Sequence, residues 1–220
     1  MSVQSISPGQ VVSQIARIYL DQSWVLIGTA LVIYALYFVV ALLLPGSAGF
    51  AVAILFWALS ILYQGMVVEL VQDVQDGRRD HSVGQLLRSV EPVFWPLVAV
   101  SILAGLGIAI GFVFLIIPGL ILMVIWSVVA PVTVLERPGV SAAFGRSREL
   151  VRGNGWNVFG VIVLVFLAVA VIGVAAGLLA DSLGSVGRAL VQWAISSALA
   201  PVTALSASVL YFTLTGSRQT

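Results

Sequence analysis

The sequence predicts an all-α integral membrane protein that crosses the bilayer six times. Apolar residues make up 60% of the chain and charged residues only 9%, whereas a soluble domain is about 45–50% apolar and about 25% charged. The apolar residues are collected in long uncharged runs, and the arginines lie mostly between these runs. A helix needs about 20 apolar residues to cross a bilayer. We therefore predict a single polytopic membrane domain over residues 1–220.

The individual helices follow from the uncharged runs, which cover Trp24–Leu44, Gly49–Val68, Val93–Leu135, Trp156–Ala180 and Ala189–Ser217. The run Val93–Leu135 is long enough for two crossings. Its Pro118-Gly119 pair marks the expected break, because this pair does not continue a helix. The predicted transmembrane helices cover about residues 24–44, 49–70, 94–117, 119–135, 156–180 and 187–214.

Short amphipathic helices are predicted before the first, third and fifth crossings. Between Gly139 and Arg152, apolar residues recur on one face at helical spacing and charged residues lie opposite. Such a segment is suited to lie in the headgroup layer with its apolar face in the lipid. All three segments lead to a tryptophan, Trp24, Trp95 or Trp156, the typical anchor at the interface. The recurrence suggests three units related by a pseudo-threefold axis along the membrane normal.

The arginines indicate how the chain is oriented. Of the ten basic residues, all arginines, only Arg188 falls in a loop on the opposite side from the rest. Cytoplasmic loops carry an excess of basic residues. Both termini and the two basic loops are therefore expected in the cytoplasm.

A resemblance to a known family adds to this interpretation. The matching elements are Pro118-Gly119, Ala130-Pro131, Glu136, Ala143 with Arg146-Ser147, Leu150, Gly153, Trp156 and Leu210-Tyr211. In these the chain resembles a bacterial six-helix family that includes the membrane domain of glycerophosphoryl diester phosphodiesterases and uncharacterised stand-alone relatives. The resemblance implies a multi-pass protein of the bacterial inner membrane. Residues 1–220 are not expected to contain the phosphodiester-cleaving barrel of the fused members, so the resemblance supports the architecture and says little about activity.

Two groups of residues are candidates for binding. The first could attract anionic phospholipid headgroups, at about 1 kcal/mol per basic residue near the surface, and comprises Arg146, Arg148, Arg152, Arg78, Arg79 and Arg88. The second consists of neutral polar residues and prolines expected within the membrane, Gln64, Pro131, Thr133, Pro201 and Thr203. Both prolines belong to an Ala-Pro-Val-Thr stretch and are expected to kink their helices. The polar side chains either cap carbonyls freed by the kinks or line a cavity.

No catalytic, metal or cofactor site is predicted. His81 is the only histidine and lies in a loop, and the chain has no cysteine. Glu69, Asp73 and Asp76 recur at helical spacing and are interpreted as a solvated helix end or, alternatively, as oxygen ligands of a divalent cation. No titratable residue is expected at mid-membrane depth, which argues against proton-coupled transport.

The sequence favours a non-enzymatic membrane module that binds lipid or a membrane-protein partner, without a nucleic-acid ligand. The alternative is a small transporter or lipid-translocating protein with a cavity near the kinked helices. An intramembrane enzyme is the third hypothesis, for which the sequence shows no set of nucleophile and base.

Overall fold

The computed structural model describes residues 7–43, 49–77 and 83–219, and within these ranges the chain is helical with short connections. This confirms the predicted all-α class. The helices are α1 Pro8–Asp21, α2 Ser23–Leu43, α3 Gly49–Gln75, α4 Val83–Val90, α5 Phe94–Phe114, α6 Ile116–Ile125, α7 Val129–Leu135, α8 Val140–Val151, α9 Gly155–Ala180 and α10 Gly184–Gln219. Two 3₁₀ turns, η2 Glu91–Val93 and η3 Asp181–Leu183, connect α4 to α5 and α9 to α10.

The helices have the length and composition of membrane-spanning segments. Within the described ranges, five helices are long and apolar enough to cross a membrane. The pair α1–α2, bent by 77°, would make a sixth span if it is counted as one. Large apolar side chains are exposed along α5 and α9, and exposed apolar surface of this extent marks contact with lipid or another protein. The fold is therefore that of a membrane protein.

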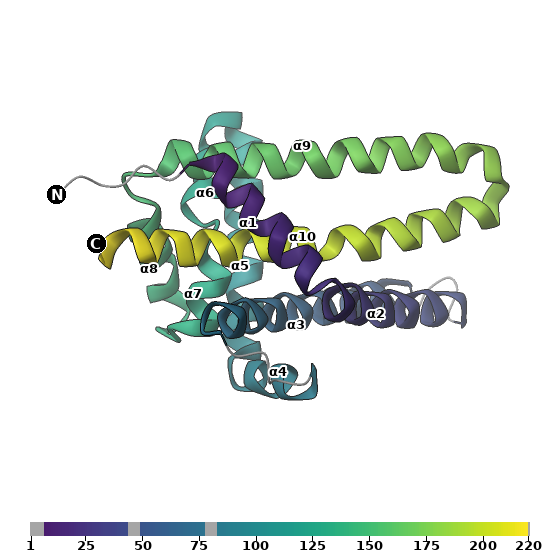
Figure 1. Ribbon diagram of the computed structural model, residues 1–220, viewed down its shortest axis with the longest axis horizontal. Coiled ribbons are helices and arrows are strands. Elements are labelled where there is room, and N and C mark those ends of the chain that lie inside the picture. The colour runs from purple at the N-terminus through teal and green to yellow at the C-terminus, as the bar shows by residue number, and fades with distance from the viewer. Residues whose placement is uncertain (1–6, 44–48, 78–82, 220) are drawn as a thin grey trace.

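Figure 1 shows how the helices are arranged. Helices α2, α3, α9 and α10 run along the long axis, and α1 passes diagonally over α9 and α10. The basic helix α8 and the end of α10 lie at one end of the molecule, whereas the α9–α10 turn lies at the other. The α5–α6 pair crosses the direction of the long helices. A short helix followed by a helical pair thus occurs three times along the chain, but the middle pair is oriented differently from the other two.

The turn between α5 and α6 is not at the predicted position. The break falls at Leu115, which has an extended backbone conformation, and Pro118-Gly119 lies in the first turn of α6, where a proline is tolerated because its amide would have no helical partner. The glycine serves close packing instead. A Cβ on Gly111 would lie 2.9 Å from the Gly119 Cα, and one on Gly119 would lie 2.5 Å from the Phe112 ring.

The fourth predicted crossing is interrupted rather than kinked. Helix α6 ends at Ile125 and α7 begins at Val129, with a turn at 126–128 between them. Pro131 cannot donate a hydrogen bond to the carbonyl of residue 127, which favours a break at this point. Pro201, in contrast, lies inside the continuous helix α10, which changes direction near its middle (Figure 1).

The short helices α1, α4 and α8 are present, but their apolar faces do not point into the lipid. These faces are buried in the protein core, through Val11, Ile15 and Ile18 of α1, Leu86 and Val90 of α4, and Ala143, Leu150 and Val151 of α8. The prediction that these apolar faces lie in the lipid is therefore wrong. They pack against neighbouring helices instead. The tryptophans that follow remain exposed, with Trp24 at 89%, Trp95 at 75% and Trp156 at 86%.

Candidate functional site

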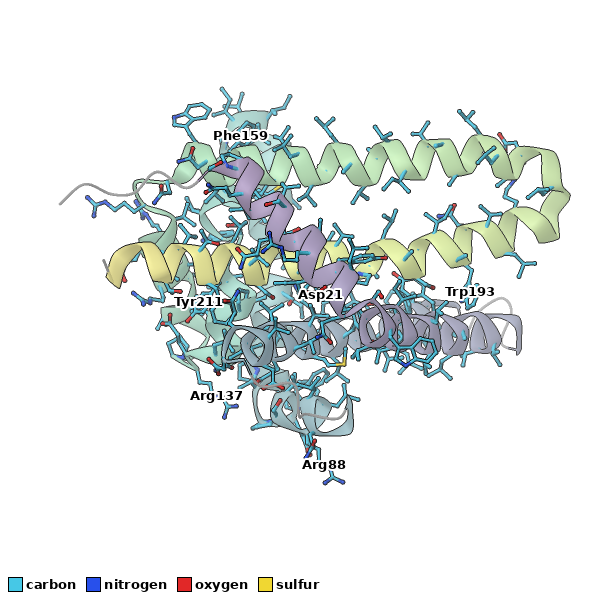
Figure 2. The ribbon with its side chains drawn as sticks, in the orientation of Figure 1. Asp21, Arg88, Arg137, Phe159, Trp193 and Tyr211 are labelled. Carbon is cyan, nitrogen blue, oxygen red and sulfur yellow. The ribbon has the colours of Figure 1, made fainter. Side chains whose placement is uncertain are left out.

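The predicted headgroup-binding arginines divide into exposed and internally bonded groups. Arg88 of α4, Arg148 of α8 and Arg152, which directly follows α8, are exposed. Figure 2 shows Arg88 pointing away from the helices. Arg78 and Arg79 lie outside the described residues. The exposed arginines keep their charge available to an external ligand.

Arg146 is held by a polar network, which we call the Glu136 cluster and which comprises Glu136, Arg146 and Tyr211. The Arg146 Nε donates to Glu136 Oε2 at 2.8 Å, and the Tyr211 hydroxyl donates to Glu136 Oε1 at 3.0 Å. A second carboxylate, that of Glu149, lies 3.6 Å from Arg146 Nη1. The hydrogen bond that Arg146 donates to Glu136 raises the pKa of Arg146, so this side chain stays charged. Its charge is thus already paired within the protein.

The Glu136 cluster joins segments that are far apart in sequence. Glu136 directly follows α7, Arg146 is on α8 and Tyr211 is on α10. The Tyr211 residue is buried, while the Glu136 and Arg146 side chains are 25% and 37% exposed. All three residues appear among those that carry the family resemblance, but their direct contact is visible only in the structure. The cluster fastens the basic helix α8 to the end of α10.

Arg137 also has a structural role. Its φ of 50° places it in the left-handed region, which is uncommon for a residue other than glycine. Its guanidinium donates to the carbonyls of Val134 and Ser89, each at 3.4 Å. Arg137 therefore links the end of α7 to α4, at the same end of the molecule as Tyr211 (Figure 2).

Two adjoining cavities lie among α2, α3, α9 and α10. The larger, of about 330 Å³, is bounded by α3, α6, α9 and α10, and the smaller, of about 230 Å³, by α2, α3 and α10. Gln64 of α3 and Thr203 of α10 line both of them. Two of the predicted cavity residues are thus brought together, although they are far apart in the sequence. We call the two spaces the Gln64 cavities.

The other predicted cavity residues have different positions. Thr133 is buried and its hydroxyl donates to the Val129 carbonyl at 2.8 Å. Pro131 is buried in α7 and lines neither of the Gln64 cavities. Pro201 lies two residues before Thr203 on α10, and the Tyr19 hydroxyl donates to the nearby Ala198 carbonyl at 3.0 Å. Thr133 thus bonds to a carbonyl of its own helix, but not to the carbonyl of residue 127 that Pro131 leaves without its helical partner.

Ser127 is a further neutral polar residue within an apolar run, and the structure gives it a special position. It lies in the break between α6 and α7 and lines the larger Gln64 cavity. Its hydroxyl oxygen is buried and has no hydrogen-bond partner among the described residues. Buried polar groups are nearly always hydrogen-bonded, and an exception calls for an explanation such as a bound molecule. The sequence offered one sign of this position. Pro131, four residues after Ser127, cannot donate a hydrogen bond to the Ser127 carbonyl and therefore disturbs the helix there.

The acidic residues at the end of α3 do not form a metal site in the part of the chain that the structure describes. No group of three or more potential ligands is found there. Glu69 and Asp73 instead line a cavity of about 270 Å³ together with Arg88 and Ser89. A guanidinium on the same cavity opposes the binding of a cation. His81 lies outside the described residues.

No protein-family model, curated protein or solved structure matches this chain. The resemblance to the six-helix bacterial family therefore stays a prediction.

Proposed function

We propose that this protein is a non-enzymatic membrane module that binds anionic phospholipids at one end of its helical bundle. The observation that supports the proposal most directly is the exposure of Arg88 on α4, Arg148 on α8 and Arg152 at the end of α8. The exposed Trp95 and Trp156 follow these helices, and tryptophan is enriched at the membrane interface. Since the apolar faces of α4 and α8 are buried, the attraction to the lipid is electrostatic.

The proposal places the basic end on the cytoplasmic side of a bacterial inner membrane, with both termini there. Helix α8 with Arg148 lies at this end, and Arg88 of α4 lies on the side of the bundle nearer its middle (Figure 2). Arg188 lies near the α9–α10 turn and pairs with Asp181 at 2.9 Å. Anionic lipids give the cytoplasmic surface a negative potential that attracts basic segments. Orientation and lipid binding therefore have a common electrostatic cause.

Single cysteines test this orientation in a chain that has none of its own. Cysteine at Leu183 is expected to react with a membrane-impermeant thiol reagent in intact cells, because the α9–α10 turn faces outward. Cysteines at Asp76 and Ser141 are expected to react only after the cells are permeabilised. The reverse pattern would contradict the proposed topology.

Removal of single charges tests lipid binding. Arg148→Gln and Arg152→Gln are each expected to weaken the retention of anionic lipid about fivefold, corresponding to about 1 kcal/mol per arginine near an anionic surface. Native mass spectrometry with phosphatidylglycerol and phosphatidylcholine measures the retention. Arg188→Gln, at the opposite end, removes the same charge and is the matched control.

One result of this lipid-retention experiment would contradict the proposed lipid binding. Equal retention of both lipids by the wild type and all three variants would show that the arginines act only as orientation signals. Binding to a membrane-protein partner would then be the remaining form of this proposal.

The second candidate function is a small transporter or lipid-translocating protein. The Gln64 cavities favour it, because they place polar groups inside the bundle beside the bend of α10. They are lined by no charged residue among those described, so ion-coupled transport receives no support from them.

A further inference from the structure

We infer that the Gln64 cavities bind an uncharged lipid whose polar end carries carbonyl or hydroxyl oxygens. The inference concerns a different site from the anionic surface of α4 and α8 and does not depend on that proposal. It deepens the second candidate function by naming the class of ligand. Four properties of the cavities support it: size, lack of charge, free hydrogen-bonding groups and access from the lipid.

The size of the cavities suits part of a lipid molecule. Small-molecule sites usually measure about 300–1,000 Å³ and are mainly apolar with a few placed polar groups. The larger Gln64 cavity, of about 330 Å³, has this character, since its walls are formed largely by Val161, Val165, Val169 and Leu210. The smaller cavity adds about 230 Å³ beyond Gln64 and Thr203.

The lack of charge restricts the ligand. No described residue that lines either cavity is ionisable at neutral pH, since the polar lining consists of hydroxyl and amide side chains. An ionised phosphate or ammonium group moved into such a site would lose its hydration without gaining a counter-ion, at a cost of several kcal/mol. The ligand therefore carries no charge on the part that enters.

The hydrogen-bonding groups point to oxygen on the ligand. No described residue bonds the Gln64 amide, which offers two donors and an acceptor. The Ser127 hydroxyl is buried and lacks a partner. Thr203 and Ser206 already donate to the carbonyls of Ala200 and Val202, at 3.1 and 2.6 Å, so their oxygens are left as acceptors. Carbonyl oxygens satisfy the free donors, and hydroxyl groups satisfy both donors and acceptors.

Access comes from the bilayer. Phe166 of α9 lines the larger cavity and is 69% exposed on a helix of membrane-spanning composition. The cavity thus reaches the outer surface of the bundle at α9. A ligand that enters here passes through lipid, and this route selects an amphiphile over a water-soluble solute.

Dioleoylglycerol and dioleoylphosphatidic acid test the inference, because they share acyl chains and differ in the charged phosphate. The full chain, solubilised in detergent, is titrated with each lipid and the bound fraction is measured by native mass spectrometry. Gln64→Leu is expected to weaken dioleoylglycerol binding about tenfold, as the loss of buried hydrogen bonds predicts. Thr203→Val, which preserves shape, is expected to weaken it about threefold.

Matched controls separate the site from general effects on folding. Gln192→Leu changes a glutamine on the same helix as Thr203 that lines neither cavity, and Thr133→Val changes a threonine elsewhere in the core. Both are expected to bind dioleoylglycerol like the wild type. Ala207→Phe fills the larger cavity without removing a polar group and is expected to abolish binding there.

The outcomes are decisive in both directions. Failure of the wild type to bind dioleoylglycerol, or equal binding by all variants, would overturn the inference. Phosphatidic acid binding that Gln64→Leu weakens as strongly as dioleoylglycerol binding would also overturn it, since the site would then accept charge. Phosphatidic acid binding lost in Arg152→Gln with dioleoylglycerol binding intact would support two separate sites.

Discussion

The substitution Gly111→Ala is expected to destabilise the protein by about 1–3 kcal/mol, the usual cost of overpacking a tight contact. The new Cβ would lie 2.9 Å from the Gly119 Cα and 3.0 Å from the Gly119 nitrogen. These are backbone atoms, which cannot move aside as the end of a side chain can. The α5–α6 pair would have to separate. Thermal unfolding in detergent micelles measures the change.

A glycine on the same helix provides the control. Gly105 has no atom within 4 Å of the position of its added Cβ. Gly105→Ala is therefore expected to leave stability unchanged or to raise it by up to about 1 kcal/mol, because alanine favours a helix over glycine. Equal destabilisation by both substitutions would show that the close approach of Gly111 and Gly119 is not responsible.

The substitution Glu136→Ala is expected to destabilise the protein by about 1–2 kcal/mol. It removes two hydrogen bonds, one from the Tyr211 hydroxyl and one from the Arg146 guanidinium. A hydrogen bond to a charged group contributes about 1.5–3 kcal/mol, but Arg146 is partly exposed and regains water, which reduces the loss. Tyr211→Phe, which removes one of the two bonds, is expected to cost about 1 kcal/mol.

A double-mutant cycle determines whether the Glu136 cluster acts as a unit. Residues of one network show coupling energies of about 0.5–3 kcal/mol, whereas distant residues are additive. Arg146→Gln is therefore expected to cost less in a Glu136→Ala background than in the wild type. The exposed Arg148→Gln, two residues away on α8, is expected to be additive with Glu136→Ala. Additivity of both pairs would contradict the proposed role of the cluster.

The candidate sites were only partly predictable. The exposed arginines of α8 could be recognised because charged residues at helical spacing must share a face. The pairing of Arg146 could not, because the sequence does not show that Tyr211 and Glu136, 75 residues apart, lie within hydrogen-bonding distance. Gln64 and Thr203 were predicted to be cavity residues from their polarity within apolar runs. That both line the same two cavities depends on how α3 packs against α10.

The prolines also show which features could be predicted from the sequence and which depend on packing. Proline lacks an amide hydrogen, so a disturbance near Pro131 follows from its chemistry alone. Whether the helix bends or breaks depends on the packing around it, and the structure shows a break that leaves Ser127 with an unpaired hydroxyl. The predicted break at Pro118 was wrong because a proline is tolerated in the first turn of a helix. The chain turns at Leu115, and Pro118 then falls in the first turn of α6.

The sequence by itself determined that the chain is helical and belongs in a membrane. Long uncharged runs leave no alternative, because in lipid the backbone must satisfy its own hydrogen bonds and a helix does so within one segment. Only the tertiary structure decided which surfaces remain available. The apolar faces of α1, α4 and α8 are amphipathic in the sequence whether they meet lipid or protein, and the neighbouring helices cover them. Contacts of that kind depend on the relative positions of helices, which local periodicity does not encode.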